Sequence, residues 1–259
     1  MPLSDHDFMR YSRQILLPEV GECGQQRFGQ AHVLIVGVGG LGTLAAQYLA
    51  AAGIGKLTLI DGDEVEQSNL PRQLLFAEAD IGANKAEVAA AKLMQAYSGC
   101  QINSFGQFLT AETASDVFAD KYCPIDLLLD CSDSFTVRQL VNRLACEHQL
   151  TLVSASAAHF QGQLLSINPQ RAADSGCYQC LYPSDMSVSQ TCQTIGVLGP
   201  MVGTLASMQA LMSLNLLLQA EPFSQSKQRL TASKVQSNNL LGKLFRFDGT
   251  QFSWRQAAL

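Results

Sequence analysis

Residues 33–42 read V-L-I-V-G-V-G-G-L-G, an apolar run that stops at Gly37 and opens into a glycine turn before a helical pattern. Glycines let a backbone turn tightly and approach a phosphate closely, and the following helix offers unpaired N–H groups at its positive end. A second apolar run, residues 56–61, ends in Asp61, 19 residues after Gly42, where a carboxylate can bind ribose hydroxyls. The two runs together predict a nucleotide site.

Apolar runs and helical patterns alternate along the first part of the chain. Runs typical of buried strands cover residues 32–37, 56–61, 100–107, 125–131 and 151–155, and helical patterns cover residues 42–52, 84–97, 111–120 and 135–148. This alternation predicts an α/β fold with a Rossmann-like, mostly parallel sheet and flanking helices. Because right-handed crossovers bring the carboxyl ends of parallel strands to one edge, we expect Gly39, Gly40, Asp61 and Asp133 to meet there.

The pattern changes after residue 156. A further strand is expected at residues 161–168, and residues 244–247 and 252–255 are typical of an antiparallel hairpin. Residues 195–220 are apolar enough to raise the question of a membrane span, but interspersed Ser, Gln and Asn residues favour a long buried or interface helix. Residues 221–239, rich in Gln, Ser and Lys, are the expected linker or mobile loop.

Composition narrows the class of protein. The chain has 259 residues, 47% of them hydrophobic and 15% charged, with a net charge of -5, so we expect one domain. An acidic chain lacks the excess of basic residues expected of a protein that binds nucleic acid or an anionic membrane. The first ten residues lack the basic start and apolar stretch of a signal peptide, so we do not expect export. In a chain that is not exported, the eight cysteines are expected to be reduced, metal-bound or catalytic. We expect a cytoplasmic location.

The identity of the nucleotide depends on the charges near the glycine turn. Gly37, Gly39 and Gly42 satisfy the G-x-G-x-x-G pattern of dinucleotide sites, so a NAD-dependent dehydrogenase is an alternative. No His or Lys has an evident role in hydride transfer, however. Arg72, within S-N-L-P-R-Q, and Lys85, at the start of the next helix, would supply two cations. A triphosphate fits that charge better than a dinucleotide.

The segment D-C-S-D, residues 130–133, follows an apolar strand. A carboxylate there could hold Mg²⁺, which prefers one or two Asp side chains together with phosphate oxygens and water. A simpler reading is that Asp130 or Asp133 caps the helix that begins near Phe135. Both roles can coexist, with Asp130 structural and Asp133 catalytic.

At this point several motifs resemble one family. They are R-Y-S-R-Q (10–14), G-V-G-G-L-G (37–42), D-G-D followed by N-L-P-R-Q (61–73), Lys85, D-C-S-D (130–133), C-Y-Q-C (177–180) and T-C-Q-T-I-G-V-L-G-P (191–200). Their order and spacing are similar to those of the ThiF/MoeB/HesA adenylyltransferases, relatives of the ubiquitin-activating enzymes. The segments near residues 7–17 and 176–183 look most like the ThiF branch, which activates the sulfur carrier of thiamine biosynthesis.

The resemblance implies a reaction and its residues. The C-terminal glycine carboxylate of a small ubiquitin-fold carrier ending in Gly-Gly attacks the α-phosphate of ATP and releases pyrophosphate. By motif position, Asp133 would bind Mg²⁺, Asp61 the ribose, and Gly40 the phosphates. The triphosphate would be lined by Asn69, Arg72, Gln73 and Lys85, and the remaining nucleotide contacts would come from Gly37, Gly39, Gly42 and Asp63.

Two further residues take their roles from the resemblance. The arginine matching Arg13 reaches the phosphates of the neighbouring subunit, which implies a homodimer; on pattern alone, Arg13 is a solvated residue of an N-terminal helix. The cysteine matching Cys192 joins the carrier covalently during sulfur transfer, with a sulfur donor protein as a further partner. An inert loop thiol is the alternative, because Gln193 replaces the arginine common after that cysteine.

Zinc is doubtful. Cys177 and Cys180 have the spacing of half a tetrahedral thiolate site, but the second C-x-x-C that completes it in the family is missing from this sequence. Zinc could be absent, held by other ligands, or replaced by oxidation of the pair, and we expect a zinc-free remnant.

The resemblance also divides the chain, and it leaves alternatives open. It implies a single adenylation domain over 1–259, with an N-terminal helical arm (1–30), a nucleotide-binding core (31–156) and a carrier-binding and dimer portion (157–259). A MoeB-like enzyme for the molybdopterin carrier would use the same chemistry. A tRNA-modifying relative should show basic patches, which an acidic chain lacks. A binding or scaffold protein with decayed catalysis would bind ATP without turnover.

Overall fold

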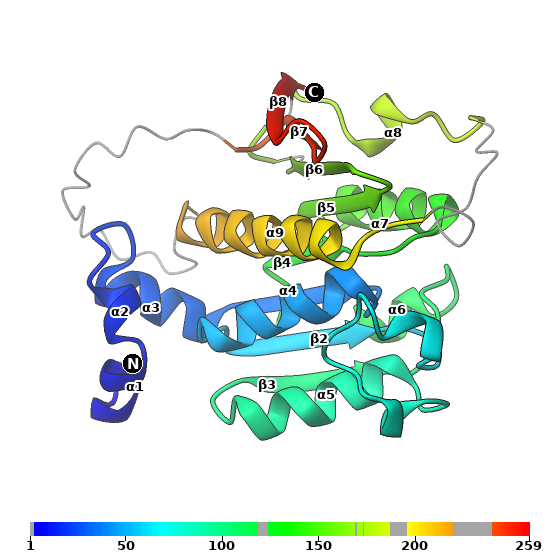
Figure 1. The fold of residues 1–259 in the computed structure, drawn as a ribbon. Helices are drawn as coiled ribbons and strands as arrows, with labels where there is room; N and C mark the ends of the chain where they lie inside the picture. The colour runs from blue at the N-terminus through cyan, green and yellow to red at the C-terminus, as the bar shows by residue number, and fades with distance from the viewer. Residues whose placement is uncertain (1–2, 119–123, 169, 173, 187–195, 220–239) are drawn as a thin grey trace.

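The computed structural model describes residues 3–118, 124–168, 170–172, 174–186, 196–219 and 240–259. Its centre is an eight-stranded sheet in the order β3-β2-β1-β4-β5-β6-β7-β8 (Figure 1). The strands are β1 His32–Val36, β2 Lys56–Ile60, β3 Gln101–Phe105, β4 Leu127–Asp130, β5 Thr151–Ala158, β6 Gln161–Ile167, β7 Lys243–Asp248 and β8 Ser253–Ala258. The first five strands pair in parallel and the last three antiparallel, which confirms the α/β fold class.

Helices cover both faces of the sheet. The described helices are α1 Asp5–Arg10, α2 Ser12–Ile15, α3 Gly21–Gln30, α4 Gly40–Ala51, α5 Lys85–Ala96, α6 Ala114–Val117, α7 Phe135–Glu147, α8 Tyr178–Leu181 and α9 Gly199–Gln219, with 3₁₀ turns η1 Gln67–Asn69 and η2 Glu78–Asp80. Alternate residues of β1 separate two cores. Val33 and Ile35 pack with α3, α4, α5 and α9, whereas Leu34 and Val36 pack with α6, α7 and α8. Strands buried on both faces explain the continuous apolar runs in the sequence.

The long helix α9 is a core element. It is long and apolar enough to cross a membrane by length and composition, but it packs against α4, β5 and β6. Leu205, Ala206, Gln209 and Ser213 on its inner face are fully buried, and Figure 1 shows α9 lying beside α4 and running roughly along the strands. The buried helix predicted for residues 195–220 is therefore confirmed.

The glycine turn depends on close backbone approach at two positions. Gly37 has φ of +89°, and a Cβ there would lie 2.8 Å from the carbonyl carbon and oxygen of Cys131. A Cβ at Gly42 would lie 1.9 Å from the carbonyl oxygen of Gly37. Glycine is required at both positions, because α4 otherwise could not begin so close to the ends of β1 and β4.

The N-terminal segment lies at the other end of the sheet. Helices α1 to α3 cluster beside the end of α4 that is far from the glycine turn (Figure 1). The side chains of Gln14 and Gln25 donate hydrogen bonds to the carbonyl oxygen of Ala52, which follows α4, at 3.3 and 2.9 Å. These contacts attach the expected helical arm to the nucleotide-binding core.

Some expected boundaries differ from the structure. Of the helix expected over 111–120, the structure describes residues 111–118, and there the helix begins only at Ala114, in α6. Thr110 and Thr113 bond to each other's backbone N–H groups and form a turn before it. The hairpin of β7 and β8 forms as predicted and extends the sheet through β6. The loop expected at 221–239 lies outside the described residues. The division at residue 156 stays a prediction, and the hydrogen-bonded ladder crosses it from β5 to β6.

We predict that Gly42→Ala lowers the free energy of unfolding by about 2 kcal/mol or more, because its Cβ must displace the Gly37 carbonyl from the turn. Gly29→Ala, in α3, is the matched control, since a Cβ there meets nothing within 4 Å and should stabilise by about 0.5 kcal/mol. Urea denaturation at fixed protein concentration measures both. Equal stability of the two variants would show that the turn tolerates a side chain.

Candidate functional site

A cavity of about 500 Å³ opens at the carboxyl ends of the parallel strands. It is lined by most of the residues predicted from the sequence, namely Gly37, Gly39, Gly40, Asp61, Asp63, Asn69, Arg72, Gln73, Lys85 and Asp133. The expected meeting of Gly39, Gly40, Asp61 and Asp133 at one edge is therefore confirmed. Gly42 lies below the turn, against Gly37, and is absent from the cavity's lining.

Asp61 joins the glycine turn to the end of β2. Its Oδ2 accepts a hydrogen bond from the backbone N–H of Val38 at 2.6 Å, and its Oδ1 accepts one from Asp63 N–H at 2.9 Å. Burial raises the pKa of this carboxyl above its usual value, although the two backbone donors and Lys85 act in the opposite direction. The carboxylate is thus held rigidly beside the turn, with acceptor capacity left for a ligand hydroxyl.

The loop that follows β2 forms one wall. Asn69 closes a capping box with Glu66 around η1. Gln73 is 4% exposed, and its side-chain Oε1 is the one buried side-chain N or O atom without a hydrogen-bond partner among the described residues. An unpaired buried amide oxygen is costly unless a ligand or water donates to it. Gln73 thus lines the cavity and carries an acceptor that no described residue satisfies.

The start of α9 completes this wall. A Cβ at Gly199 would lie 2.6 Å from the carbonyl oxygen of Pro71, and a Cβ at Gly40 would lie 2.8 Å from Cγ1 of Val202. Val197 and Val202 also line the cavity. The C-terminal part of the chain thus contributes to the site, a contact between distant segments that motif reading did not include.

The two predicted cations both line the cavity. Lys85 is the first residue of α5, as expected, and its Nζ pairs with Asp63 Oδ2 at 3.0 Å. Its side chain is 8% exposed, whereas that of Asp63 is 53% exposed. Nη1 of Arg72 donates to the carbonyl oxygen of Ser68 at 2.8 Å. Asn84 caps α5, and its Nδ2 donates to the Asp61 carbonyl at 3.1 Å, a role that sequence reasoning missed.

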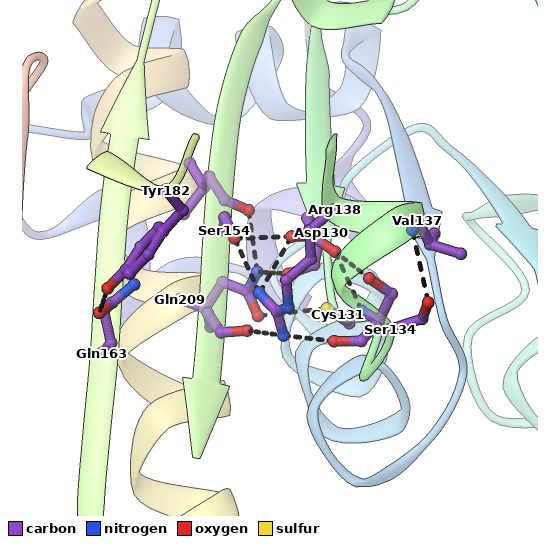
Figure 2. A network of polar contacts seen from close by, with 12 residues as sticks. Asp130, Cys131, Ser134, Val137, Arg138, Ser154, Gln163, Tyr182 and Gln209 are labelled. Carbon is purple, nitrogen blue, oxygen red and sulfur yellow. Dashed lines mark hydrogen bonds and ion pairs between the residues drawn. The ribbon is translucent and has the colours of Figure 1, made fainter. Parts of the chain in front are cut away.

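Asp130 and Asp133 have different environments, and Figure 2 shows the polar contacts of Asp130. Asp130 is buried, and its carboxylate accepts hydrogen bonds from Arg138 Nη1 at 3.1 Å, Ser154 Oγ at 2.6 Å and Ser132 Oγ at 2.6 Å. Asp133 is exposed and lines the cavity. The structural reading of Asp130 is confirmed. The reading of either aspartate as the cap of α7 is wrong, because Ser134 is the N-cap and accepts from Val137 N–H.

Arg138 and Gln209 hold the end of β4 in place, and neither was singled out in the sequence. Arg138 also donates to Ser154 Oγ at 3.0 Å and to the Ala155 carbonyl at 2.9 Å, so it joins α7 to β5. Gln209 Nε2 donates to the carbonyl oxygens of Asp130 and Val153 at 3.1 and 3.0 Å, which fastens α9 to β4 and β5 (Figure 2). A buried Gln inside an apolar helix was the available signal for the second residue.

Other predicted residues lie away from the cavity. Arg13 is exposed on α2, whose neighbour Gln14 contacts the far end of α4. Since a 12-residue helix is about 18 Å long, Arg13 is remote from the cavity of its own chain. Cys177 and Cys180 lie at α8, with their sulfurs 3.7 Å apart. Cys192 falls outside the described residues.

We predict that Arg138→Met lowers the free energy of unfolding by about 3 to 5 kcal/mol, because it leaves the buried Asp130 carboxylate without its cation. Arg143→Met on the same helix is the control. Arg143 is exposed and 3.8 Å from Glu147, so its loss should change stability by less than about 0.5 kcal/mol. Denaturation curves that coincide for the two variants would contradict the structural role of Arg138.

Comparison with known proteins adds relatives over nearly the whole chain. The chain is 40% identical over 257 residues to the sulfur carrier protein ThiS adenylyltransferase of Escherichia coli, covering 99% of this chain and 93% of that protein. It is 42% identical over 218 residues to adenylyltransferase and sulfurtransferase MOCS3 of Drosophila ananassae, covering 83% of this chain. In the latter comparison the chain spans 47% of the relative, about half its length.

Solved structures share the fold. Escherichia coli MccB in complex with MccA-N7isoASN has a TM-score of 0.76 at 22% identity, covering 99% of this chain and 72% of that chain. PaaA has a TM-score of 0.74 at 22% identity, covering 99% of this chain and 74% of that chain. The model of the ThiF family matches residues 11–259. With this match and the 40% identical relative, the sequence and its cavity lead to one assignment: the chain belongs to the ThiF family.

Proposed function

We propose that this chain is an adenylyltransferase that uses ATP to activate the C-terminal glycine carboxylate of a small ubiquitin-fold sulfur carrier in thiamine biosynthesis. One observation carries the proposal: ten residues predicted from dispersed motifs line a single cavity at the strand ends. The 40% identity to a protein named ThiS adenylyltransferase supports the choice of carrier.

The cavity suits a nucleoside triphosphate in an extended pose. In this pose the ribose hydroxyls donate to Asp61, whose carboxylate the N–H groups of Val38 and Asp63 already hold. The phosphates pass over Gly39 and Gly40, where the first turn of α4 leaves unpaired N–H groups. Arg72 and Lys85 bind the outer phosphates, and the side-chain amide N–H groups of Asn69 and Gln73 donate to them. The unpaired Oε1 of Gln73 accepts from a water molecule.

The side chains that line the cavity carry more negative than positive charge, so binding of a polyphosphate there requires additional cations. Five carboxylates line it, from Asp61, Asp63, Glu64, Glu66 and Asp133. The lining cations are Arg72, Lys85 and Arg138, and Arg138 is already paired with Asp130. A polyphosphate in this lining would be repelled unless cations arrive with it or from a partner.

Mg²⁺ fits the first of these needs. Asp133 presents an exposed, hard oxygen donor to the cavity, the type of ligand that Mg²⁺ combines with phosphate oxygens and water. When bound, the ion would neutralise phosphate charge. A cation from a partner would be Arg13, acting on the site of a neighbouring subunit. Arg13 is remote from the cavity of its own chain, so it cannot act there. Both roles belong to the proposal, as does the homodimer.

Little acid–base chemistry is required of the protein. The carrier's terminal carboxylate is ionised at neutral pH and is itself the nucleophile that attacks the α-phosphorus, with pyrophosphate as the leaving group. The side chains therefore act by orienting the two reactants and by stabilising charge on the departing pyrophosphate, chiefly through Arg72 and Lys85. Placing Arg72 on a loop fixed by Pro71 and α9 serves that orientation.

The remaining expectations complete the proposal. Cys192 would join the activated carrier covalently during sulfur transfer, and a sulfur donor protein would then be a partner. The cytoplasmic location stays a prediction. MOCS3 relatives keep a molybdopterin-type carrier as the second candidate. Since both carriers undergo the same chemistry, only an assay with each carrier separates them.

Pyrophosphate exchange into ATP tests the function. With Mg²⁺, exchange should depend on a ThiS-like carrier ending in Gly-Gly, and Asp133→Ala should reduce it at least about a hundredfold, because charge stabilisation of this kind is worth that much. Asp116→Ala, at an exposed aspartate outside both the cavity and the expected carrier-binding portion, is the matched control and should exchange normally. Exchange with the molybdopterin carrier alone would select the second candidate, and ATP binding without exchange would identify a scaffold protein.

Mixing two inactive variants tests the role of Arg13. Subunits carrying Arg13→Ala and subunits carrying Asp133→Ala should each be inactive alone. If Arg13 acts on the neighbouring subunit, random exchange should restore about a quarter of the wild-type rate, because half of the dimers are mixed and each holds one complete site. No recovery after verified subunit exchange would show that Arg13 does not act in this way.

A further inference from the structure

Phe108 places an aromatic ring at the part of the cavity next to Asp61. The residue follows β3, which pairs with β2 in the sheet, and it lines the cavity although it is 59% exposed. Its ring covers the backbone of Gly62, because a Cβ on that glycine would lie 2.6 Å from Cδ2 and 2.7 Å from Cγ of Phe108. Since Gly62 directly follows Asp61, the ring stands one residue beyond the carboxylate that is proposed to bind the ribose.

The backbone that carries this ring is fixed, although the ring itself is open. The carbonyl oxygen of Phe108 accepts a hydrogen bond from Thr113 Oγ1 at 2.9 Å, and the N–H of Thr110 donates to the same hydroxyl oxygen at 2.9 Å. The next residue, Leu109, is 5% exposed and belongs to the same hydrophobic core as Val36. The ring is therefore presented to the cavity from a defined backbone position, as a ligand contact requires.

The direction of a bound nucleoside brings its base to this ring. In a ribonucleoside the 2′ and 3′ hydroxyls lie between the base on C1′ and the phosphates on C5′, so hydroxyls held at Asp61 send the two groups in opposite directions. The strands β1 and β3 flank β2 on opposite sides. The glycine turn after β1 receives the phosphates, and its Val38 N–H donates to Asp61 Oδ2 at 2.6 Å. The base then extends toward the loop after β3, where the ring of Phe108 lies over Gly62.

We propose that Phe108 is the stacking residue for the nucleobase and that it makes the site prefer purine over pyrimidine triphosphates. The inference rests on the proposed function, because it takes the orientation of the nucleotide from the ribose contact at Asp61. An aromatic ring stacks on the π-face of any base, and the two fused rings of a purine offer more area than the single ring of a pyrimidine. Gly62 belongs to the same arrangement, because any side chain there would displace the ring.

Calorimetric titration of the intact chain tests the inference. With Mg²⁺ present, the wild-type chain should bind ATP more tightly than CTP. Phe108→Ala should weaken ATP binding about tenfold and bring the two affinities together, since loss of one base–aromatic stack costs a factor of this order. Phe108→Trp should retain the preference for ATP. Inorganic tripolyphosphate, which has no base, should bind the wild type and both variants equally, which separates loss of stacking from a damaged phosphate site.

Phe252→Ala is the matched control, because Phe252 is 85% exposed and lies outside the cavity lining. It should bind all three ligands as the wild type does. Three results would overturn the inference: ATP binding that Phe108→Ala leaves unchanged, an equal loss of ATP and tripolyphosphate binding in that variant, or a wild-type chain that binds ATP and CTP alike. The last comparison needs no variant. The titrations contain no carrier, so a failure of pyrophosphate exchange would count against the proposed activity and leave the stacking result standing.

Discussion

The buried ion pair between Asp130 and Arg138 determines how the end of β4 is presented to the cavity. Its carboxylate and guanidinium bond to one another and also to Ser132, Ser154 and Ala155, so α7, β4 and β5 meet at one point. A buried pair contributes geometry more dependably than net stability, because desolvation offsets much of its attraction. Here the ion pair fixes the conformation of the short loop that carries Asp133. The exposed carboxylate can stay mobile only over a small range, because a rigid anchor lies three residues before it.

Gln209 extends this arrangement to the C-terminal part of the chain. Its side chain bonds to two backbone carbonyls at the ends of β4 and β5 and accepts the thiol hydrogen of Cys131, so all of its polar atoms are used in the interior. The same helix begins at Gly199, against Pro71, on the opposite wall of the cavity. One rigid helix thereby relates the loop bearing Arg72 to the loop bearing Asp133. The backbone positions of those two loops are set by the core of the protein, as positioning of a polyphosphate requires.

The features that the sequence could predict are those decided by local chemistry. Gly37 and Gly42 mark a turn whose backbone excludes a Cβ, and Asp61 and Lys85 stand at element ends that apolar periodicity locates. Arg138 was missed because its partner Asp130 is buried only after the strand and helix pack. Helix capping was misassigned to Asp130 or Asp133 because aspartate and serine are comparable caps by propensity, and only the folded chain shows that Ser134 accepts from Val137 N–H. Gln209 contacts the Asp130 carbonyl at the end of β4, 79 residues earlier in the chain, and no local sequence pattern predicts such a contact.

Different parts of α7 contact different elements. Its first turn follows Asp133 and is fixed by Ser134 and Arg138, whereas Asn142, about two turns further along, contacts Cys177 of α8. Asn142 fixes the start of α8, because its Oδ1 also accepts from Tyr178 N–H at 3.0 Å. Gln139, on the same helix, donates to the Tyr182 carbonyl, and the buried Tyr178 ring lies beside Phe135, with ring centroids 6.5 Å apart. One helix, α7, therefore positions both the loop that carries Asp133 and the short helix α8.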